Sequence, residues 1–219
     1  MDILDIHTHH DSPHPLEAIL NISPEKLQSR LEKHCYSVGI HPWDIHADVL
    51  ERQWNEIVSA ASDANILALG ETGLDKCCST PLEIQQQVFE RHILLSEQIQ
   101  KPLIIHCVHS NAELIKLKQQ FHPTVPWIIH GFRGKQELAK EFLRHHFYLS
   151  FGEHYQNSAA CAVPASSLFI ETDESLVDIH TLYEQMSDVR KVPVAELVKD
   201  IRQNIESVFE NHNYVTKFS

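Results

Sequence analysis

The sequence has no cluster of lysine and arginine, no CxxC pair and no long hydrophobic run. Its net charge of −12 at pH 7 argues against an electrostatic clamp around a nucleic acid, which requires a basic face. A nucleic-acid substrate would therefore have to be bound at a few local contacts, for example through bound divalent cations. No run approaches the roughly 20 apolar residues of a membrane helix. The first ten residues, MDILDIHTHH, also lack the basic region and cleavage site of a secretory signal.

Cysteine is scarce, and its pattern argues against two common roles. The chain has an odd number of cysteines, two of them adjacent: Cys35, Cys77, Cys78, Cys107 and Cys161. Neither a disulfide framework nor a structural zinc knuckle fits this pattern. We therefore expect reduced thiols and a cytoplasmic location, with no membrane association and no obligatory protein partner.

The chain does contain enough apolar residues for a real core. It has 219 residues, of which 42% are hydrophobic, and this size and composition predict one domain over residues 1–219. Histidine is unusually frequent, with 17 copies. Because histidine is so abundant, a single histidine is weak evidence for a site. Only its position along the chain can identify it as a candidate ligand.

Short apolar runs alternate with amphipathic helical patterns along most of the chain. We predict eight strands, at residues 2–7, 17–22, 35–40, 65–71, 102–107, 125–130, 146–151 and 167–172. Helical patterns follow most of them, so the predicted fold class is α/β, a distorted TIM-like (β/α)8 barrel. Residues 8–16 are too short and proline-rich for a crossover helix, so the first outer helix is expected to be missing. Residues 153–164 also form a weak helical pattern.

Potential metal ligands stand at or near the ends of five of these runs. They are His7, His9, Glu71, His106, His130 and Asp173. Alternate residues of a strand share a face, so one ion can meet both imidazoles of a His-x-His. Any one of these residues, taken alone, more often has a structural role. Six of them at or near strand ends together predict a site for two divalent ions. Most of the other histidines are expected at the surface.

Six motifs carry a resemblance to a known family. In chain order they are DIHTHH at 5–10, GIHPW at 39–43, GETGLD at 70–75, PLIIHC at 102–107, IIHGFRG at 128–134 and IETD at 170–173. Together they resemble the TatD family of metal-dependent hydrolases. The resemblance implies one ion among His7, His9, Glu71 and Asp173, with Glu71 bridging to a second ion held by His106 and His130. It also implies a deoxyribonuclease that removes nucleotides 3′→5′ with Mg²⁺ or a similar ion.

The sequence departs from the family pattern near the expected substrate. Many members carry an arginine two residues after the fifth-strand histidine, where this chain has Val108. Arg133 replaces a small polar residue, and we hypothesise that it takes over phosphate binding, because a guanidinium can pair with two phosphate oxygens. The alternative is that Arg133 is a solvated loop residue.

Roles for the remaining residues follow from the two-ion interpretation. Asp173 is the candidate catalytic base and Glu71 sets the separation of the ions. His41 is expected to contact a substrate oxygen, and Asp75 to orient a ligand histidine or cap a turn. Trp43 could stack on a base, although packing under its loop is the more ordinary role. The ligand set leaves the metal open among Mg²⁺, Mn²⁺ and Zn²⁺.

Three functions are compatible with these residues. The first is a phosphodiesterase acting on DNA ends with a metal-activated water. The second is an amidohydrolase-like esterase, lactonase or deacylase, because the net negative charge suits a small substrate better than a polyanion. The third is a metal-binding protein without catalytic activity. Turnover of DNA, esters and lactones distinguishes them.

Overall fold

A computed structural model describes residues 2–12, 14–31 and 34–210, and it confirms the predicted barrel. Each of the eight predicted runs overlaps a strand: β1 (Asp5–Thr8), β2 (Ala18–Ile22), β3 (Cys35–Val38), β4 (Ile66–Asp75), β5 (Leu103–Val108), β6 (Trp127–Ile129), β7 (Tyr148–Phe151) and β8 (Leu168–Ile170). They form one parallel sheet in the order β1 to β8. Buried isoleucine, leucine, valine and phenylalanine side chains from all eight strands belong to one continuous apolar core.

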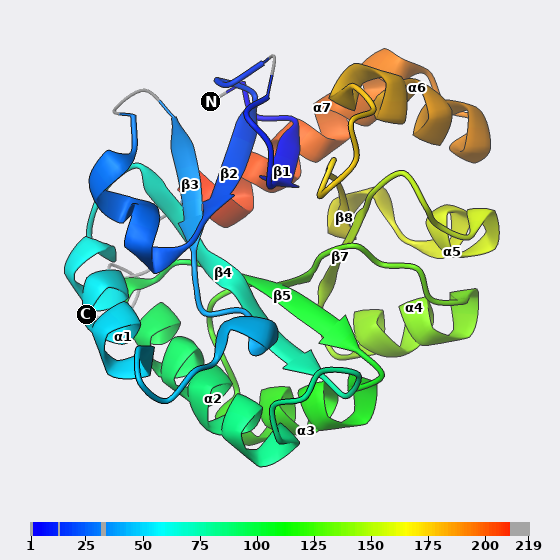
Figure 1. Cartoon of the computed structure of the whole chain (residues 1–219). Coiled ribbons are helices and arrows are strands. Elements are labelled where there is room, and N and C mark those ends of the chain that lie inside the picture. Colours follow the sequence, from blue (N-terminus) through cyan, green and yellow to red (C-terminus); the bar gives the residue numbers. More distant parts are fainter. Residues whose placement is uncertain (1, 13, 32–33, 211–219) are drawn as a thin grey trace, which may run out of the picture.

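The sheet curls so that β8 returns to β1 (Figure 1). A single bridge between Thr8 and Asp173 joins the two edges. At this bridge the Asp173 amide donates to the His7 carbonyl at 2.9 Å, and the His9 amide donates to the Asp173 carbonyl at 3.1 Å. The barrel is therefore nearly closed, with its last seam made just beyond the end of β8.

Helices lie outside the strands (Figure 1). The α-helices are α1 (Leu50–Ala60), α2 (Leu82–Ile99), α3 (Asn111–Phe121), α4 (Gln136–Arg144), α5 (Asn157–Ala162), α6 (Ile179–Arg190) and α7 (Val194–Ile205). Short 3₁₀ segments occur at η1 (Pro24–Ser29), η2 (Pro42–Asp44) and η3 (Ala165–Ser167), and α7 runs into a π-helical turn, η4 (Glu206–Glu210). None of the described helices has the length and apolar character needed to cross a membrane.

The connection between β1 and β2 has no helix in its described residues 9–12 and 14–17, as the sequence predicts. The weak pattern at 153–164 contains only the six-residue helix α5. The gap in the outer ring thus lies beside β1, where the barrel also closes.

Strand β4 is longer than predicted, and this corrects the placement of Glu71. The run was expected to end at Glu71, but the strand continues to Asp75, so Glu71 lies inside it. Gly70 and Gly73 make this possible because β5 passes very close to both. An added Cβ would meet the Ile104 carbonyl oxygen at Gly70 and the His106 carbonyl oxygen at Gly73, and both glycines have positive φ angles. The pairing of β4 with β5 also shifts register between Leu69 and Thr72, around Glu71.

Candidate metal centre

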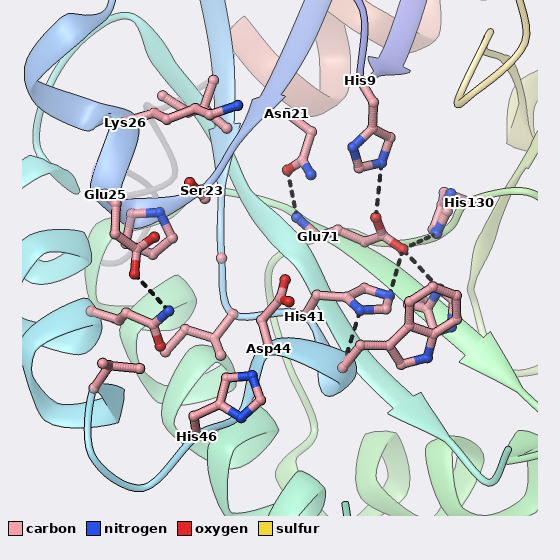
Figure 2. Close-up of a pocket in the computed structure, with 18 of the residues that line it drawn as sticks. His9, Asn21, Ser23, Glu25, Lys26, His41, Asp44, His46, Glu71 and His130 are labelled. Atoms are coloured by element: carbon pink, nitrogen blue, oxygen red, sulfur yellow. Dashed lines mark hydrogen bonds and ion pairs between the residues drawn. The ribbon is translucent and has the colours of Figure 1, made fainter. Parts of the chain in front are cut away.

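The structure brings all six predicted ligands to one place, at the end of the barrel where the strands terminate. They come from β1, β4 and β5 and from the segments just after β1, β6 and β8. Glu71 lies at their centre and is almost completely buried. Figure 2 shows its carboxylate between His9 on one side and His41 and His130 on the other.

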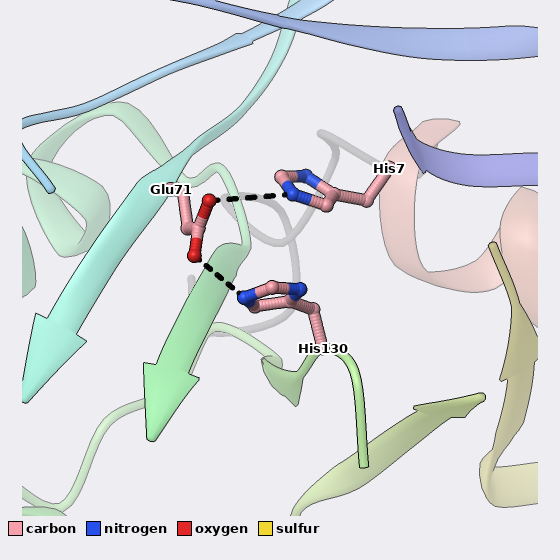
Figure 3. A group of neighbouring side chains, drawn as sticks. All are labelled: His7, Glu71 and His130. Carbon is pink, nitrogen blue, oxygen red and sulfur yellow. Dashed lines mark ion pairs between the residues drawn. The ribbon is translucent and has the colours of Figure 1, made fainter. Parts of the chain in front are cut away.

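The two carboxylate oxygens of Glu71 face different groups of histidines. Oε2 lies 3.2 Å from His9 Nε2 and 3.5 Å from His7 Nε2. Oε1 lies 2.7 Å from both His106 Nδ1 and His130 Nε2. Figure 3 shows the division, with His7 at one oxygen and His130 at the other. A carboxylate with this surrounding can join two ions, one at each oxygen.

Asp173 lies with the histidines of β1. Its Oδ1 is 3.6 Å from His9 Nε2 and 3.8 Å from His7 Nε2. The backbone at Asp173 has a φ of 55°, a left-handed conformation that aspartate and asparagine tolerate better than most residues. The bridge to β1 holds this conformation, so the closing of the barrel itself positions the carboxylate.

Unsatisfied polar atoms indicate that the group fits a metal. The side chain of His7 is fully buried, and neither of its ring nitrogens makes a hydrogen bond to any described residue. Burying an imidazole without partners costs free energy, and coordination of a cation by one nitrogen would offset that cost. His7, His9 and Asp173 place ligand atoms within 4.8 Å of one another, as do His7, Glu71 and His130.

The electrostatics of the group favour an ionised Glu71. Burial by itself would raise the pKa of Glu71, but the nearby charge of His130 and hydrogen bonds from His106, His130 and His41 hold that pKa well below its usual range. For His130, burial lowers the pKa but Glu71 and Glu171 together raise it well above its usual value. These surroundings keep Glu71 ionised, which is the form of a carboxylate that binds a cation.

Two further carboxylates support the histidines from behind. Asp75 Oδ2 lies 3.2 Å from His106 Nε2, and its Oδ1 accepts from the Cys77 amide at 2.7 Å, so Asp75 contacts the candidate ligand histidine and also caps the turn. Glu171 Oε1 lies 3.3 Å from His130 Nδ1 and accepts from the Gly131 amide at 2.5 Å. Both leave the opposite ring nitrogen facing Glu71, so they fix which nitrogen is available to a metal.

Sequence reasoning missed Glu171, although a signal for it was present. It stands two residues before Asp173 in IETD, the same spacing that pointed to His7 and His9. Asp5 was also missed. Its buried carboxylate accepts from Thr172 Oγ1 at 2.7 Å, the Thr172 amide at 3.1 Å and the His7 amide at 3.2 Å, which ties β1 to the end of β8. Burial raises the pKa of Asp5 to about 7.

His41 faces the centre with a defined ring orientation. Its Nδ1 accepts from the Trp43 amide at 3.2 Å, so in the neutral ring the proton belongs on Nε2. Nε2 lies 3.3 Å from Glu71 Oε1. His41 therefore offers a hydrogen-bond donor to the centre. Trp43 does not pack under its loop: its side chain is 61% exposed, and its Nε1 donates to Asp75 Oδ2 at 2.7 Å.

A cavity of about 620 Å³ opens over the centre (Figure 2). Its wall includes His9, Glu71, His106, His130 and Asp173, and also Lys26, Trp43 and Glu174. Arg133 is not part of this wall. It is exposed and lines a smaller neighbouring cleft that shares Asp173 and Glu174 with the cavity.

Imidazoles and carboxylates gathered at the carboxyl ends of parallel barrel strands are typical of metal-dependent hydrolases. The chain belongs to one family within this class, the TatD-related DNases, whose family model matches residues 20–210.

Curated relatives and a solved structure agree with this assignment. An uncharacterised metal-dependent hydrolase of Bacillus subtilis, YabD, is 27% identical over 195 residues, covering 79% of this chain and 76% of its own. The protein named 3′-5′ ssDNA/RNA exonuclease TatD from Citrobacter koseri is 27% identical over 165 residues, covering 68% and 61%. The crystal structure of YJJV, a TatD homologue from Escherichia coli, has a TM-score of 0.81 at 19% identity and covers 95% of this chain and 98% of its own, which shows the shared fold.

Proposed function

We propose that this metal-dependent hydrolase cleaves phosphodiester bonds at the 3′ ends of DNA, with two divalent ions held on either side of Glu71. The observation that supports the proposal most strongly is the division of the Glu71 oxygens between His7 and His9 on one side and His106 and His130 on the other. The relative from Citrobacter koseri is named as an exonuclease of this polarity.

The ligands divide into two sets in this proposal. His7, His9 and Asp173 would hold one ion, His106 and His130 would hold the other, and Glu71 could contribute an oxygen to each. Two such ions would polarise a phosphoryl oxygen and lower the pKa of a bound water. Mg²⁺, Mn²⁺ and Zn²⁺ are all compatible with this mixture of imidazole and carboxylate.

Asp173 is the proposed general base. It is partly exposed to the cavity, whereas Glu71 is buried and surrounded by imidazoles. A carboxylate at the cavity wall can accept the proton of the attacking water and pass it to solvent. Its left-handed backbone fixes the direction of the side chain, which favours a single position for proton transfer.

His41 is the proposed donor to the substrate. Because Nδ1 already accepts from the Trp43 amide, Nε2–H is available to a phosphoryl oxygen. Arg133 lies in the adjoining cleft and not in the wall of the cavity. It would therefore contact a second phosphate of the substrate and not the one that is cleaved.

A second candidate is hydrolysis of a small ester or lactone. It is favoured by the charge of the cavity wall, which includes one lysine, Lys26, and three acidic residues outside the ligand set, Glu25, Asp44 and Glu174. Such a wall repels a long polyanion unless bound cations offset the charge. The same centre could activate water against a carbonyl carbon.

The test is release of nucleotides from an end-labelled single-stranded DNA oligomer with Mg²⁺, Mn²⁺ or Zn²⁺. We expect release that depends on metal and is lost in Asp173→Asn, which keeps a side chain suited to the left-handed backbone. Asp188→Asn, an exposed position on α6, is the matched control and should act like wild type. Equal release by wild type and Asp173→Asn would contradict the proposal, and turnover of esters or lactones alone would favour the second candidate. The expected cytoplasmic location stays a prediction, which cell fractionation can check.

A further inference from the structure

A second group of histidines and carboxylates lies outside the cavity. His14, Glu17 and His180 place one ligand atom each within 4.8 Å of one another. We propose that this group binds one transition-metal ion of the Zn²⁺ type and thereby fixes the β1–β2 connection to helix α6. None of its residues belongs to the described wall of the cavity.

The contacts within the group form two pairs that face each other. His180 Nε2 lies 3.0 Å from Glu17 Oε2, and His14 Nε2 lies 3.2 Å from Asp178 Oδ2. The two imidazole rings meet edge to face, with centroids 4.8 Å apart. The group therefore offers two imidazoles and the Glu17 carboxylate within reach of one ion, and a zinc ion bound by three protein ligands takes water as its fourth.

An unsatisfied carboxylate oxygen indicates that the group fits a cation. Glu17 Oε2 has no exposed surface, and no described residue donates a hydrogen bond to it, although His180 Nε2 is only 3.0 Å away. A buried carboxylate oxygen without a donor is costly. A divalent ion between Glu17 and the imidazoles would satisfy this oxygen. It would also offset the negative charge of the Glu17 carboxylate.

Most of the group is already held in place by the fold. Glu17 directly precedes β2, and its carbonyl accepts from the Leu4 and Asp5 amides at 2.8 and 2.9 Å. Asp178 caps α6, where its Oδ1 accepts from the His180 amide at 2.9 Å. His14 and Glu17 both come from the connection that lacks a helix, but Glu17 is tied to β1 by these backbone bonds. Binding therefore needs little rearrangement, and its structural effect falls on that connection.

The donor types separate this group from a magnesium site. Two imidazoles favour Zn²⁺, Co²⁺ or Ni²⁺, whereas Mg²⁺ prefers oxygen ligands and retains water. The four side chains are 27–49% exposed, so an ion can enter from solvent. The proposed role is structural: the ion joins a loop to a helix at the gap in the outer ring.

The test counts ions in the full chain. Metal-free protein is titrated with Zn²⁺, and bound metal is measured by elemental analysis after removal of excess ion. We expect His180→Ala and Glu17→Gln each to bind one ion fewer than wild type, whatever number the catalytic centre holds. Co²⁺ titration should show the same difference in the visible absorption of tetrahedral cobalt. Zn²⁺ should also raise the Tm of wild type more than that of either variant.

The matched control is His145→Ala. His145 is a partly exposed histidine just after α4 that pairs with Glu141 of that helix at 3.3 Å, without a second histidine in the pair. It should keep the wild-type count of ions. His180→Ala should retain the wild-type rate of hydrolysis in Mg²⁺, which shows that the catalytic centre is intact. Equal counts in wild type, His180→Ala and Glu17→Gln, or the same loss in His145→Ala, would overturn the proposal. The four residues would then be charge pairs only.

Discussion

The β4–β5 side of the barrel and the seam between β8 and β1 are built in different ways. β4 and β5 are the longest strands and pair at five registered positions, from Leu69 with Leu103 to Asp75 with Val108. The seam has one bridge, between Thr8 and Asp173. Yet each side presents histidines to the same carboxylate of Glu71. A strong backbone ladder is therefore not required to position ligands, provided that side chains hold the weaker side.

At the seam the holding side chain is Asp5. Its carboxylate replaces missing ladder contacts by accepting from Thr172 and from the His7 amide. On the β4–β5 side, backbone pairing holds the two strands together, and two glycines let the strands approach closely. A bound pair of ions would join both sides through Glu71.

The largest effect is expected for Glu71→Gln, which breaks the link between the two sides. An amide has one oxygen acceptor and no negative charge, so it cannot serve both groups of histidines. We expect activity to fall on the order of 10³-fold or more and metal binding to weaken at both positions. Steady-state hydrolysis and calorimetric titration measure the two effects. If Glu71→Gln retains near wild-type activity, Glu71 is not the bridge.

The next effect concerns acid stability on the α2 side. His92 on α2 is fully buried, with Nδ1 2.8 Å from the Val88 carbonyl and Nε2 accepting from the Ile40 amide at 3.2 Å. Burial lowers its pKa from 6.5 to about 4. Because the unfolded chain takes up this proton first, stability that is complete above pH 6.5 is lost as the pH falls towards 4. The loss from this residue is roughly 3 kcal/mol.

Urea unfolding between pH 4 and 7 measures this loss, with His92→Gln as the variant that lacks the titrating ring. The free energy of unfolding of the variant should depend less on pH over this range. Asp5 has the opposite effect on the pH dependence of stability. Because its pKa is raised, it contributes stability at acidic pH that is lost as the pH rises through about 7. If the free energy of unfolding of His92→Gln falls towards acidic pH as steeply as that of wild type, His92 on α2 is not the source of the loss.

A smaller effect is expected from Glu171→Gln, which removes the carboxylate behind His130. A glutamine can still accept from the Gly131 amide, but it presents no charge to the His130 ring. We expect affinity for the ion on the His106 and His130 side to fall roughly ten- to a hundredfold, with the other ion less affected. Glu184→Gln, at an exposed position of α6, is the control. Equal weakening of both ions would contradict the assignment of Glu171 to one side.

The smallest effect compares two threonines, one on each side. Thr172→Val removes the hydroxyl that donates to Asp5, which leaves a buried carboxylate oxygen without that donor. We expect a loss of about 1–2 kcal/mol in the free energy of unfolding. Thr72→Val makes the same change on β4, where the hydroxyl is buried without a partner among the described residues, and should be nearly neutral. Equal losses in the two variants would remove Asp5 from the account of the seam.

Much of the architecture could be predicted from the sequence because apolar runs and helical patterns report burial directly. The eight strands and the missing first helix follow from such runs and from the prolines at 13 and 15. The convergence of the six candidate ligands could be predicted because parallel strands end at one face of a barrel, so residues at strand ends come together.

The supporting residues could not be predicted in the same way. Asp5 and Thr172 act across the seam, and their pairing depends on where β8 returns to β1, which no local pattern encodes. The interior position of Glu71 depends on the close approach of β5 to Gly70 and Gly73, a tertiary property. Trp43 is exposed because its indole Nε1 donates to Asp75 at the mouth of the cavity. The hydrophobicity of tryptophan alone would predict that it is buried.

The most direct test of the account is anomalous X-ray diffraction from crystals of the wild-type protein loaded with Mn²⁺. The account predicts two peaks at the centre. One lies among His7, His9, Asp173 and Glu71 Oε2, and the other among His106, His130 and Glu71 Oε1. A single peak at the centre, or two peaks of which one does not contact Glu71, would contradict the claim that this carboxylate joins the two sides of the barrel.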